Sequence, residues 1–331
     1  MRAWSCVAVL CTACASGSNV EPIDARVTDG RVIDGAGGDG AEADAAVTDA
    51  ATTDARLTDA AVIDTAAIDA RLIDATPIDA MIPIDGPPPV VTSLLLSEIV
   101  LAPTGGEFVE IVNPTAATVD LSSFYLSDAP SYWRLPVGPT MVGADSTDFV
   151  ARFPAGATIA AHGVVTVALD TAANFTIAYP TIAPTYSIAS GTMTLVTSGT
   201  GATLTNAGEP IALFFWDGAS DKVTDVDLMI AGTPSAANLF VTKSGVAIDG
   251  PDADAATGAY LTDANTLPSQ TAPGSARSTK RLALESAAVE IQTGGNGVAG
   301  HDETSEQLGT TWDTGSYTVP TPGQVPAALL P

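Results

Sequence analysis

The stretch Ser97–Asp128, SEIVLAPTGGEFVEIVNPTAATVDLSSFYLSD, decides the fold of this chain. Its first apolar run, Ser97–Val100, leads into a Pro-Thr-Gly-Gly turn, and the turn returns the chain into a second run, Glu107–Asn113. Two such runs around turn residues predict a β-hairpin. The second strand should end before Pro114, because proline cannot donate to the ladder and restricts the residue before it. A third short strand is predicted over Val119–Leu126.

The order of these elements, SEI, then EFVEIVN, then VDLSSFYLSD, resembles the lamin tail domain. That family is an immunoglobulin-like β-sandwich which also occurs as an accessory module in bacterial extracellular proteins. The resemblance implies an all-β fold whose role is interaction or tethering rather than catalysis, although a fold alone does not identify a ligand. It extends over about Ser93 to Gly323 through four later segments: LTNAGEPIALFFWDG (Leu204–Gly218), KVTDVD (Lys222–Asp227), SARSTKRL (Ser275–Leu282) and PTPG (Pro320–Gly323).

Further strands and two insertions complete the predicted sandwich. Ile159–Leu169 predicts two strands around a Gly turn, and Thr192–Val196 predicts another. The segments Pro130–Thr158 and Gly232–Pro273 are longer than a compact sandwich needs, so they are either binding loops or simple insertions. Three tryptophans are expected in the core or on a sheet face, with an aromatic sugar platform as the alternative: Trp133, Trp216 and Trp312.

The N-terminal segment predicts export. Met1-Arg2 is a short basic region, and Ala3–Leu10 is an apolar core too short to span a bilayer. Leu10–Cys14, LCTAC, resembles a lipoprotein signal-peptidase box, which implies a signal peptide over residues 1–13 and an acylated Cys14. The alternative is ordinary cleavage after Ala15, which would remove all 3 cysteines of the chain.

A regular repeat of aspartates follows the predicted signal peptide. From Asp24 to Asp79 an aspartate recurs at every fifth residue. A period of five gathers the side chains on neither one helix face nor one strand face, so the pattern suits no packed surface. A pentapeptide-repeat solenoid is the ordered alternative, but its bulky position after the aspartate holds Ala or Gly nearly everywhere. Residues 14–89 are therefore predicted to form a disordered acidic linker, and residues 90–326 the sandwich domain.

The charge of the chain limits its partners. The formal net charge is −26, from 38 acidic residues against 12 Lys and Arg. Because nucleic-acid binding needs clustered Lys and Arg, that class is excluded. The expected partners are a membrane, reached through the lipid anchor, and an unknown protein or polysaccharide of the cell envelope. We expect an exported outer-membrane lipoprotein that can be displayed at the cell surface.

The residues needed for catalysis are scarce. The chain has 2 histidines, and no Gly-x-Ser-x-Gly nucleophile elbow occurs. His162 is expected in a turn. A pair of catalytic carboxylates, as in glycosidases, stays open, but no particular pair is marked. We therefore predict no enzymatic activity and rank a hydrolase last.

Two segments are candidates for metal binding. Asp249, Asp252 and Asp254 alternate around a glycine, as in a calcium loop, although Ala256 stands where a third ligand would be expected. His301 and Asp302 follow a glycine-rich loop, but neighbouring side chains of a strand point apart, so both would need a bent backbone or partners elsewhere. Calcium is the one cofactor considered. A calcium-dependent adhesin or carbohydrate-binding protein is accordingly the alternative function.

Overall fold

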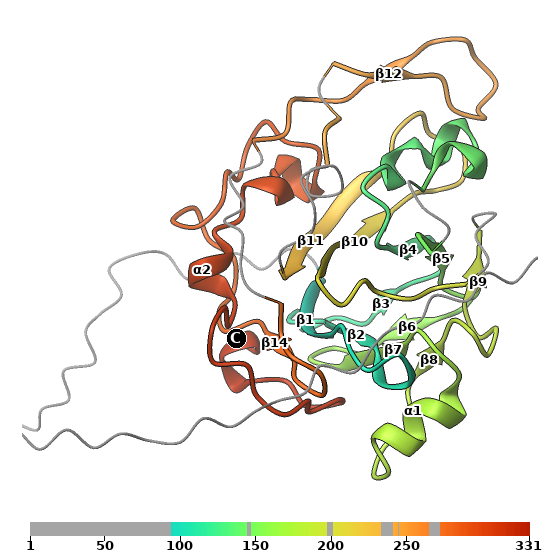
Figure 1. Cartoon of the computed structure of the whole chain (residues 1–331). Coiled ribbons are helices and arrows are strands. Elements are labelled where there is room, and N and C mark those ends of the chain that lie inside the picture. Colours follow the sequence, from blue (N-terminus) through green and yellow to red (C-terminus); the bar gives the residue numbers. More distant parts are fainter. Residues whose placement is uncertain (1–93, 144–146, 197–200, 233–240, 244, 265–271) are drawn as a thin grey trace, which may run out of the picture. The chain divides into compact units, whose positions relative to one another are not determined.

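Two five-stranded β-sheets pack face to face and form a sandwich (Figure 1). The structure is a computed structural model, and it describes residues 94–143, 147–196, 201–232, 241–243, 245–264 and 272–331. The all-β, immunoglobulin-like fold expected from the sequence is confirmed. The predictions for the signal peptide, Cys14 and the acidic linker lie outside the described residues. Among the helices that are described, none is long and apolar enough to cross a bilayer.

The first sheet contains the hairpin that the sequence predicts. Its strands follow the order β14-β1-β2-β7-β8, antiparallel except for the parallel pair β7 and β8. The Pro-Thr-Gly-Gly turn forms the 3-10 turn η1, Thr104–Gly106. The strand bounds are β1 Leu95–Val100, β2 Phe108–Val112, β7 Val164–Ala168, β8 Tyr186–Ser187 and β14 Thr279–Lys280.

The second sheet is antiparallel throughout, in the order β11-β10-β4-β5-β9. Its longest strands, β10 and β11, carry the segments that resemble the family's later motifs. The strand bounds are β4 Phe124–Ser127, β5 Val150–Arg152, β9 Thr194–Leu195, β10 Gly208–Phe215 and β11 Thr224–Gly232.

Short elements surround the two sheets. The two-stranded ribbons are β3 Val119–Asp120 with β6 Thr158–Ile159, and β12 Ala247–Ile248 with β13 Gly258–Ala259. The helices are α1 Ala172–Ala178 and α2 Leu308–Thr311. The further 3-10 turns are η2 Tyr132–Val137, η3 Pro139–Met141, η4 Val298–Gly300, η5 Glu303–Ser305 and η6 Ala327–Leu329.

Strands β1 and β2 are buried on both faces, which explains their nearly unbroken apolar sequences. Their inner face joins the main core, as Ile99 and Val109 do. On the outer face, Phe108 packs with Phe175 of α1. Leu329, from beyond the predicted domain end at residue 326, is fully buried in an outer cluster with two residues of the hairpin, Leu95 and Val112.

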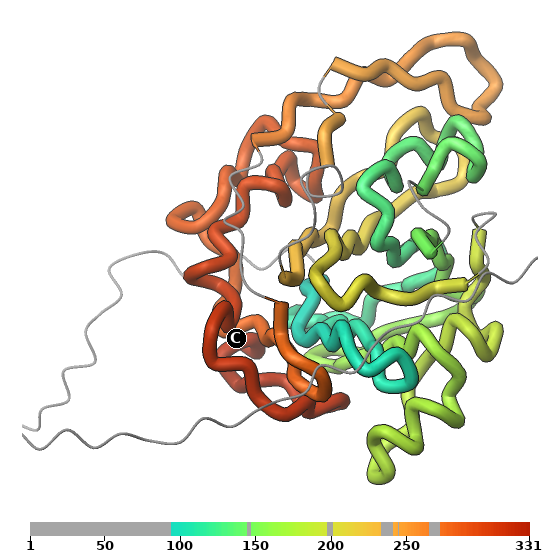
Figure 2. Tube along the Cα trace, viewed as in Figure 1, coloured from blue at the N-terminus to red at the C-terminus, as the bar shows by residue number. Residues whose placement is uncertain are grey.

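Two buried glutamates of the hairpin bind the C-terminal segment. Glu98 accepts hydrogen bonds from the backbone N–H (2.9 Å) and hydroxyl (3.1 Å) of Thr321. Glu110 accepts one from Gly323 N–H (2.5 Å), and burial, together with the nearby charge of Glu98, raises its pKa to about 7. The cyan hairpin and the red C-terminal segment accordingly lie side by side (Figure 2). These contacts connect two motifs from opposite ends of the resemblance, SEI and PTPG.

The predicted third strand is wrong in one respect, because the structure divides Val119–Leu126 into β3 and β4. The Oδ1 of Asp120 accepts a hydrogen bond from Ser122 N–H (2.8 Å), and Phe124 N–H bonds the carbonyl of Leu121 (2.9 Å). An aspartate that bonds the backbone two residues later favours a turn, and this turn breaks the strand. As a result β3 pairs with β6, whereas β4 joins the second sheet.

The other strand predictions agree with the structure. Ile159–Leu169 forms β6 and β7 around a turn, in which His162 has a positive φ of 52°. Thr192–Val196 contains β9. The core position is confirmed for Trp133 and Trp312, which are 3% and 1% exposed and so offer no platform for a sugar.

Candidate functional site

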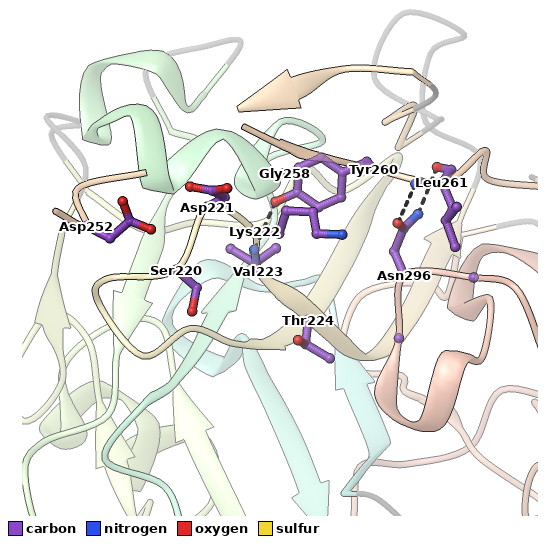
Figure 3. A pocket seen from close by; sticks show the side chains of 12 residues that line it. Ser220, Asp221, Lys222, Val223, Thr224, Asp252, Gly258, Tyr260, Leu261 and Asn296 are labelled. Carbon is purple, nitrogen blue, oxygen red and sulfur yellow. Dashed lines mark hydrogen bonds between the residues drawn. The ribbon is translucent and has the colours of Figure 1, made fainter. Parts of the chain in front are cut away.

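A cavity of about 560 Å³ opens between three loops (Figure 3). The first is the β10–β11 loop with Asp221 and Lys222, the second is the β12–β13 ribbon with Asp252, and the third is the glycine-rich loop around Asn296. Asp221 and Asp252 lie together at one end of the cavity in Figure 3, and Asn296 lies at the other. The cavity therefore joins parts of the chain that are far apart in sequence.

The β10–β11 loop is held by its own side chains. The carboxylate of Asp217 accepts hydrogen bonds from the N–H groups of Ala219 (2.9 Å) and Ser220 (2.7 Å). The Ser220 hydroxyl also donates to this carboxylate and is the largest cause of the lowered pKa of Asp217. The two N–H bonds lower this pKa further. The indole N–H of Trp216 donates to the carbonyl of Ser220 (2.8 Å). The loop is thus ordered without a ligand.

Tyr260 forms the inner wall of the cavity. Its hydroxyl accepts a hydrogen bond from Val223 N–H (2.9 Å) and donates one to the carbonyl of Trp133 (2.9 Å), and its ring packs edge-on against the Trp133 ring. Burial raises the pKa of this hydroxyl far above its usual value, so Tyr260 stays protonated. The ammonium of Lys222 lies 5.9 Å from the ring and donates to the carbonyl of Ala259 (3.0 Å).

Asn296 fastens the glycine-rich loop to the strand segment beside Tyr260. Its side-chain oxygen accepts from Leu261 N–H (2.8 Å), and its amide donates to the Leu261 carbonyl (3.0 Å). The same amide donates to the carboxylate of Asp263 (3.2 Å). Both ends of the cavity are therefore fixed by hydrogen bonds between loops.

The structure brings together two of the three predicted calcium-loop aspartates. One carboxylate oxygen each of Asp249, Asp252 and Asp221 lie within 4.8 Å of one another. Asp254 does not belong to this group; its carboxylate accepts a hydrogen bond from Ala256 N–H (2.7 Å). Asp221, from the β10–β11 loop, supplies the third carboxylate of the group.

His301 and Asp302 are separated in the way that strand geometry predicts. The Asp302 carboxylate accepts hydrogen bonds from Ala264 N–H (2.9 Å) and from the Thr304 hydroxyl (2.6 Å). The Nδ1 atom of His301 instead lies 2.8 Å from the carboxylate of Glu290. Sequence reasoning named His301 but missed this glutamate.

The aspartates of β11 form two buried ion pairs. Asp225 binds the ammonium of Lys243 (2.7 Å), which also lies 3.1 Å from Asp263. Burial alone would lower the pKa of Lys243, but the two carboxylates outweigh that effect and raise it. Asp227 binds the guanidinium of Arg281 through both of its oxygens. These two aspartates stabilise the fold and are not available to a ligand.

Part of the chain is similar to a known family. Residues 87–229 match the family model described as Lamin Tail Domain. No curated protein matches the chain. A DUF4876 family protein from Bacteroides thetaiotaomicron is similar in structure, with 14% sequence identity and a TM-score of 0.38, over 72% of this chain and 75% of that chain. The family match ends within β11, so the β12–β13 ribbon and the glycine-rich loop of the cavity lie beyond it.

Proposed function

We propose that this chain is a non-enzymatic binding and tethering protein of the cell envelope, because residues 87–229 match the model of the lamin tail domain, a non-catalytic immunoglobulin-like family. The observation that carries the proposal is the makeup of the cavity. Asp221 and Asp252 are polar groups suited to holding a ligand, and hydrogen bonds fix Tyr260 and Asn296 in the walls around them. Among the residues that line it there is no histidine or cysteine and hence no nucleophile paired with a histidine base.

In this proposal the N-terminal segments attach the folded domain to a membrane. Acylation of Cys14 would attach the protein to a membrane, and several acyl chains together anchor firmly. A flexible linker of about 75 residues has an end-to-end distance of about 50 Å, which is enough to hold a domain clear of a membrane surface. The partner of the domain would then be a protein or polysaccharide of the envelope.

Protease shaving of intact producing cells tests this arrangement. We expect added protease to release the folded domain from wild-type cells, detected with an antibody to the domain. The Cys14→Ser variant should instead be shed into the medium without protease, because it lacks the acylated residue.

The two halves of this experiment separate anchoring from display. Retention of Cys14→Ser on the cells at the wild-type level would refute the lipid anchor. Protection of the wild-type domain from protease until the outer membrane is opened would refute surface display and place the module in the periplasm.

A calcium-dependent adhesin or carbohydrate-binding protein is the second candidate, favoured by the convergence of Asp221, Asp249 and Asp252. Carboxylate oxygens are the ligands that calcium prefers. Calcium at millimolar concentration should raise Tm, and chelator should reverse the rise. The Asp221→Asn variant should lose this shift, whereas Asp254→Asn, in the same loop but outside the group, should keep it. No shift in the wild-type protein would remove this candidate.

A further inference from the structure

A second cluster of acidic side chains contains none of the residues that line the cavity, and all its members except Asp227 come from the chain between β14 and α2. It is largely buried, whereas Asp249 and Asp252 at the cavity are exposed. Burial raises the pKa values of four of its carboxylates, and the charges of nearby carboxylates raise them further; these four are Asp227, Glu285, Glu290 and Glu303. Its members are Asp227, Glu285, Glu290, Glu303 and Glu306, with Arg281 among them.

Arg281 neutralises only part of this cluster. Its guanidinium bonds Glu306 at 2.6 Å and Asp227 at 2.7 Å. The nearest oxygen of Glu285 is 3.6 Å away, beyond hydrogen-bond distance. Arg281 therefore makes no hydrogen bond to Glu285 Oε1 or to Glu290.

Three carboxylate oxygens in the cluster have no hydrogen-bond donor. They are both oxygens of Glu290 and the Oε1 of Glu285, all three fully shielded from solvent. The side chain of Glu290 has no exposed surface. An acceptor buried without a donor is costly, and each such case in a native protein calls for a missing partner.

A ring nitrogen of His301 lies beside the carboxylate of Glu290. Its Nδ1 lies 2.8 Å from Oε1 of Glu290, yet this oxygen accepts no hydrogen bond. Burial lowers the pKa of His301 below its usual 6.5, so the imidazole is neutral at neutral pH and can coordinate a metal. One ligand atom each from Glu285, Glu290 and His301 lie within 4.8 Å of one another. Ligands at about 2.0–2.2 Å from a common ion would converge from such positions.

We propose that Glu285, Glu290 and His301 bind a divalent transition-metal ion, Zn²⁺ or Mn²⁺, which stabilises the segment between β14 and α2. Two carboxylates with one imidazole form a mixed oxygen and nitrogen ligand set, which suits these ions better than the all-oxygen set that calcium prefers. The side chains of His301 and Glu285 are 14% and 12% exposed, so an ion can enter from solvent. The three ligands are not among the residues that line the proposed ligand cavity, and the site goes beyond the binding role proposed above.

The backbone fixes two of these ligands before any ion binds. Glu290 and His301 flank a bridge in which Asp302 N–H donates to the carbonyl of Ile291 (2.8 Å). Gly297 N–H donates to the carbonyl of His301 (2.8 Å). A Cβ at Gly295 would meet the His301 carbonyl and lie 2.5 Å from the Cα of Asp302, so the glycine lets the loop pack against these residues.

The electrostatics favour a cation at this position. Burial, followed by the charges of Glu306 and Asp227, raises the pKa of Glu290 to about 8, although the nearby Gln292 amide acts in the opposite direction. A cation bound between Glu285 and Glu290 would offset the repulsion between these carboxylates and their acidic neighbours.

The experiment uses the full chain, purified without a tag, with its 3 cysteines alkylated so that thiolates bind no metal. After treatment with chelator and dialysis, bound Zn²⁺, Mn²⁺ and Ca²⁺ are measured by equilibrium dialysis, and Tm is recorded with each ion. We expect one Zn²⁺ or Mn²⁺ per chain at this site. At a free concentration of about 100 times Kd, Tm should rise by about 5–10 °C.

Two variants connect this binding to the three side chains. Glu290→Gln and His301→Ala should each lower the affinity for zinc and manganese at least about 100-fold. Asp252→Asn, in the cavity group, should leave both affinities unchanged. In chelator, Glu290→Gln should be at least as stable as the wild-type protein, because the neutral amide can donate hydrogen bonds at a place where the carboxylate oxygens have no donor. A purely structural glutamate would instead show a loss of stability there.

Three results would overturn the proposal. The first is no Zn²⁺ or Mn²⁺ bound at about 1 mM. The second is binding that both Glu290→Gln and His301→Ala leave intact, which would place the ion elsewhere. The third is calcium bound as tightly as zinc and lost in the same variants, which would show that the proposed class of ion is wrong.

Discussion

The Arg281→Met variant is expected to lose about 3–5 kcal/mol of the free energy of unfolding. Arg281 is fully buried, and its guanidinium is bonded to Asp227 and Glu306. Methionine fills a similar volume but leaves these two carboxylates in the interior without a cation. The variant also loses the bond from Nε to the carbonyl of Leu96 (2.8 Å) and the stacking of the guanidinium over Trp312 (4.9 Å).

Urea unfolding followed by circular dichroism, in the presence of chelator, measures this loss. Chelator keeps a bound ion from compensating for the missing guanidinium. Adding Asp227→Asn and Glu306→Gln to Arg281→Met should restore much of the stability, because neutral side chains no longer need a cation. Arg134→Met, which removes a cation stacked on Trp133 at 4.4 Å, should cost less than about 1 kcal/mol. A loss below about 1 kcal/mol for Arg281→Met would contradict the importance of the buried pairs.

Phe108→Ala is expected to cost about 3–5 kcal/mol, through lost burial and the cavity left behind. Phe108 has no exposed surface, and its ring contacts the rings of Phe175 (5.9 Å) and Tyr179 (5.4 Å). Together these aromatic side chains attach α1 to the outer face of the first sheet.

The same urea experiment tests this prediction. Ile177→Ala, on α1 but 77% exposed, is the control and should change the free energy of unfolding by less than about 0.5 kcal/mol. Equal effects of the two variants would mean that α1 is not packed on the sheet through Phe108.

Local patterns were sufficient for the first hairpin, for several further strands and for the resemblance to the lamin tail domain. The hairpin, its turn and the strands around Gly163 follow from apolar runs and turn residues, which act over short distances in sequence. The break between β3 and β4 was missed because the Asp120 turn lies within an otherwise strand-like segment. A single side-chain hydrogen bond outweighed the β propensity there.

The candidate sites depend on contacts that no local pattern specifies. Asp249 and Asp252 were visible as a loop motif, but their third neighbour, Asp221, comes from another loop. His301 was visible because of its glycines, yet Glu290 reaches it only through the bridge between Ile291 and Asp302. Tertiary packing selects such partners, and a single sequence does not record it.

The buried cations illustrate the same limit. In a chain with a formal charge of −26, the 12 basic residues would all be expected on the surface. Arg281 and Lys243 are instead completely buried, where they pair with the aspartates of β11. The alternation of Asp225 and Asp227 on one face of a strand could be anticipated, but their partners could not.

The central position of β1 determines how the domain would respond to mechanical load. A pull transmitted through the preceding chain enters at Leu95, on a strand paired with β14 on one side and β2 on the other. The backbone of Leu96 also bonds two side chains: its N–H donates to the carboxylate of Asp227, and its carbonyl accepts from Nε of Arg281. Extraction of β1 must therefore break two ladders and the two hydrogen bonds of Leu96 together, whereas an edge strand would separate from one neighbour. A domain built in this way resists tension on its N-terminal end.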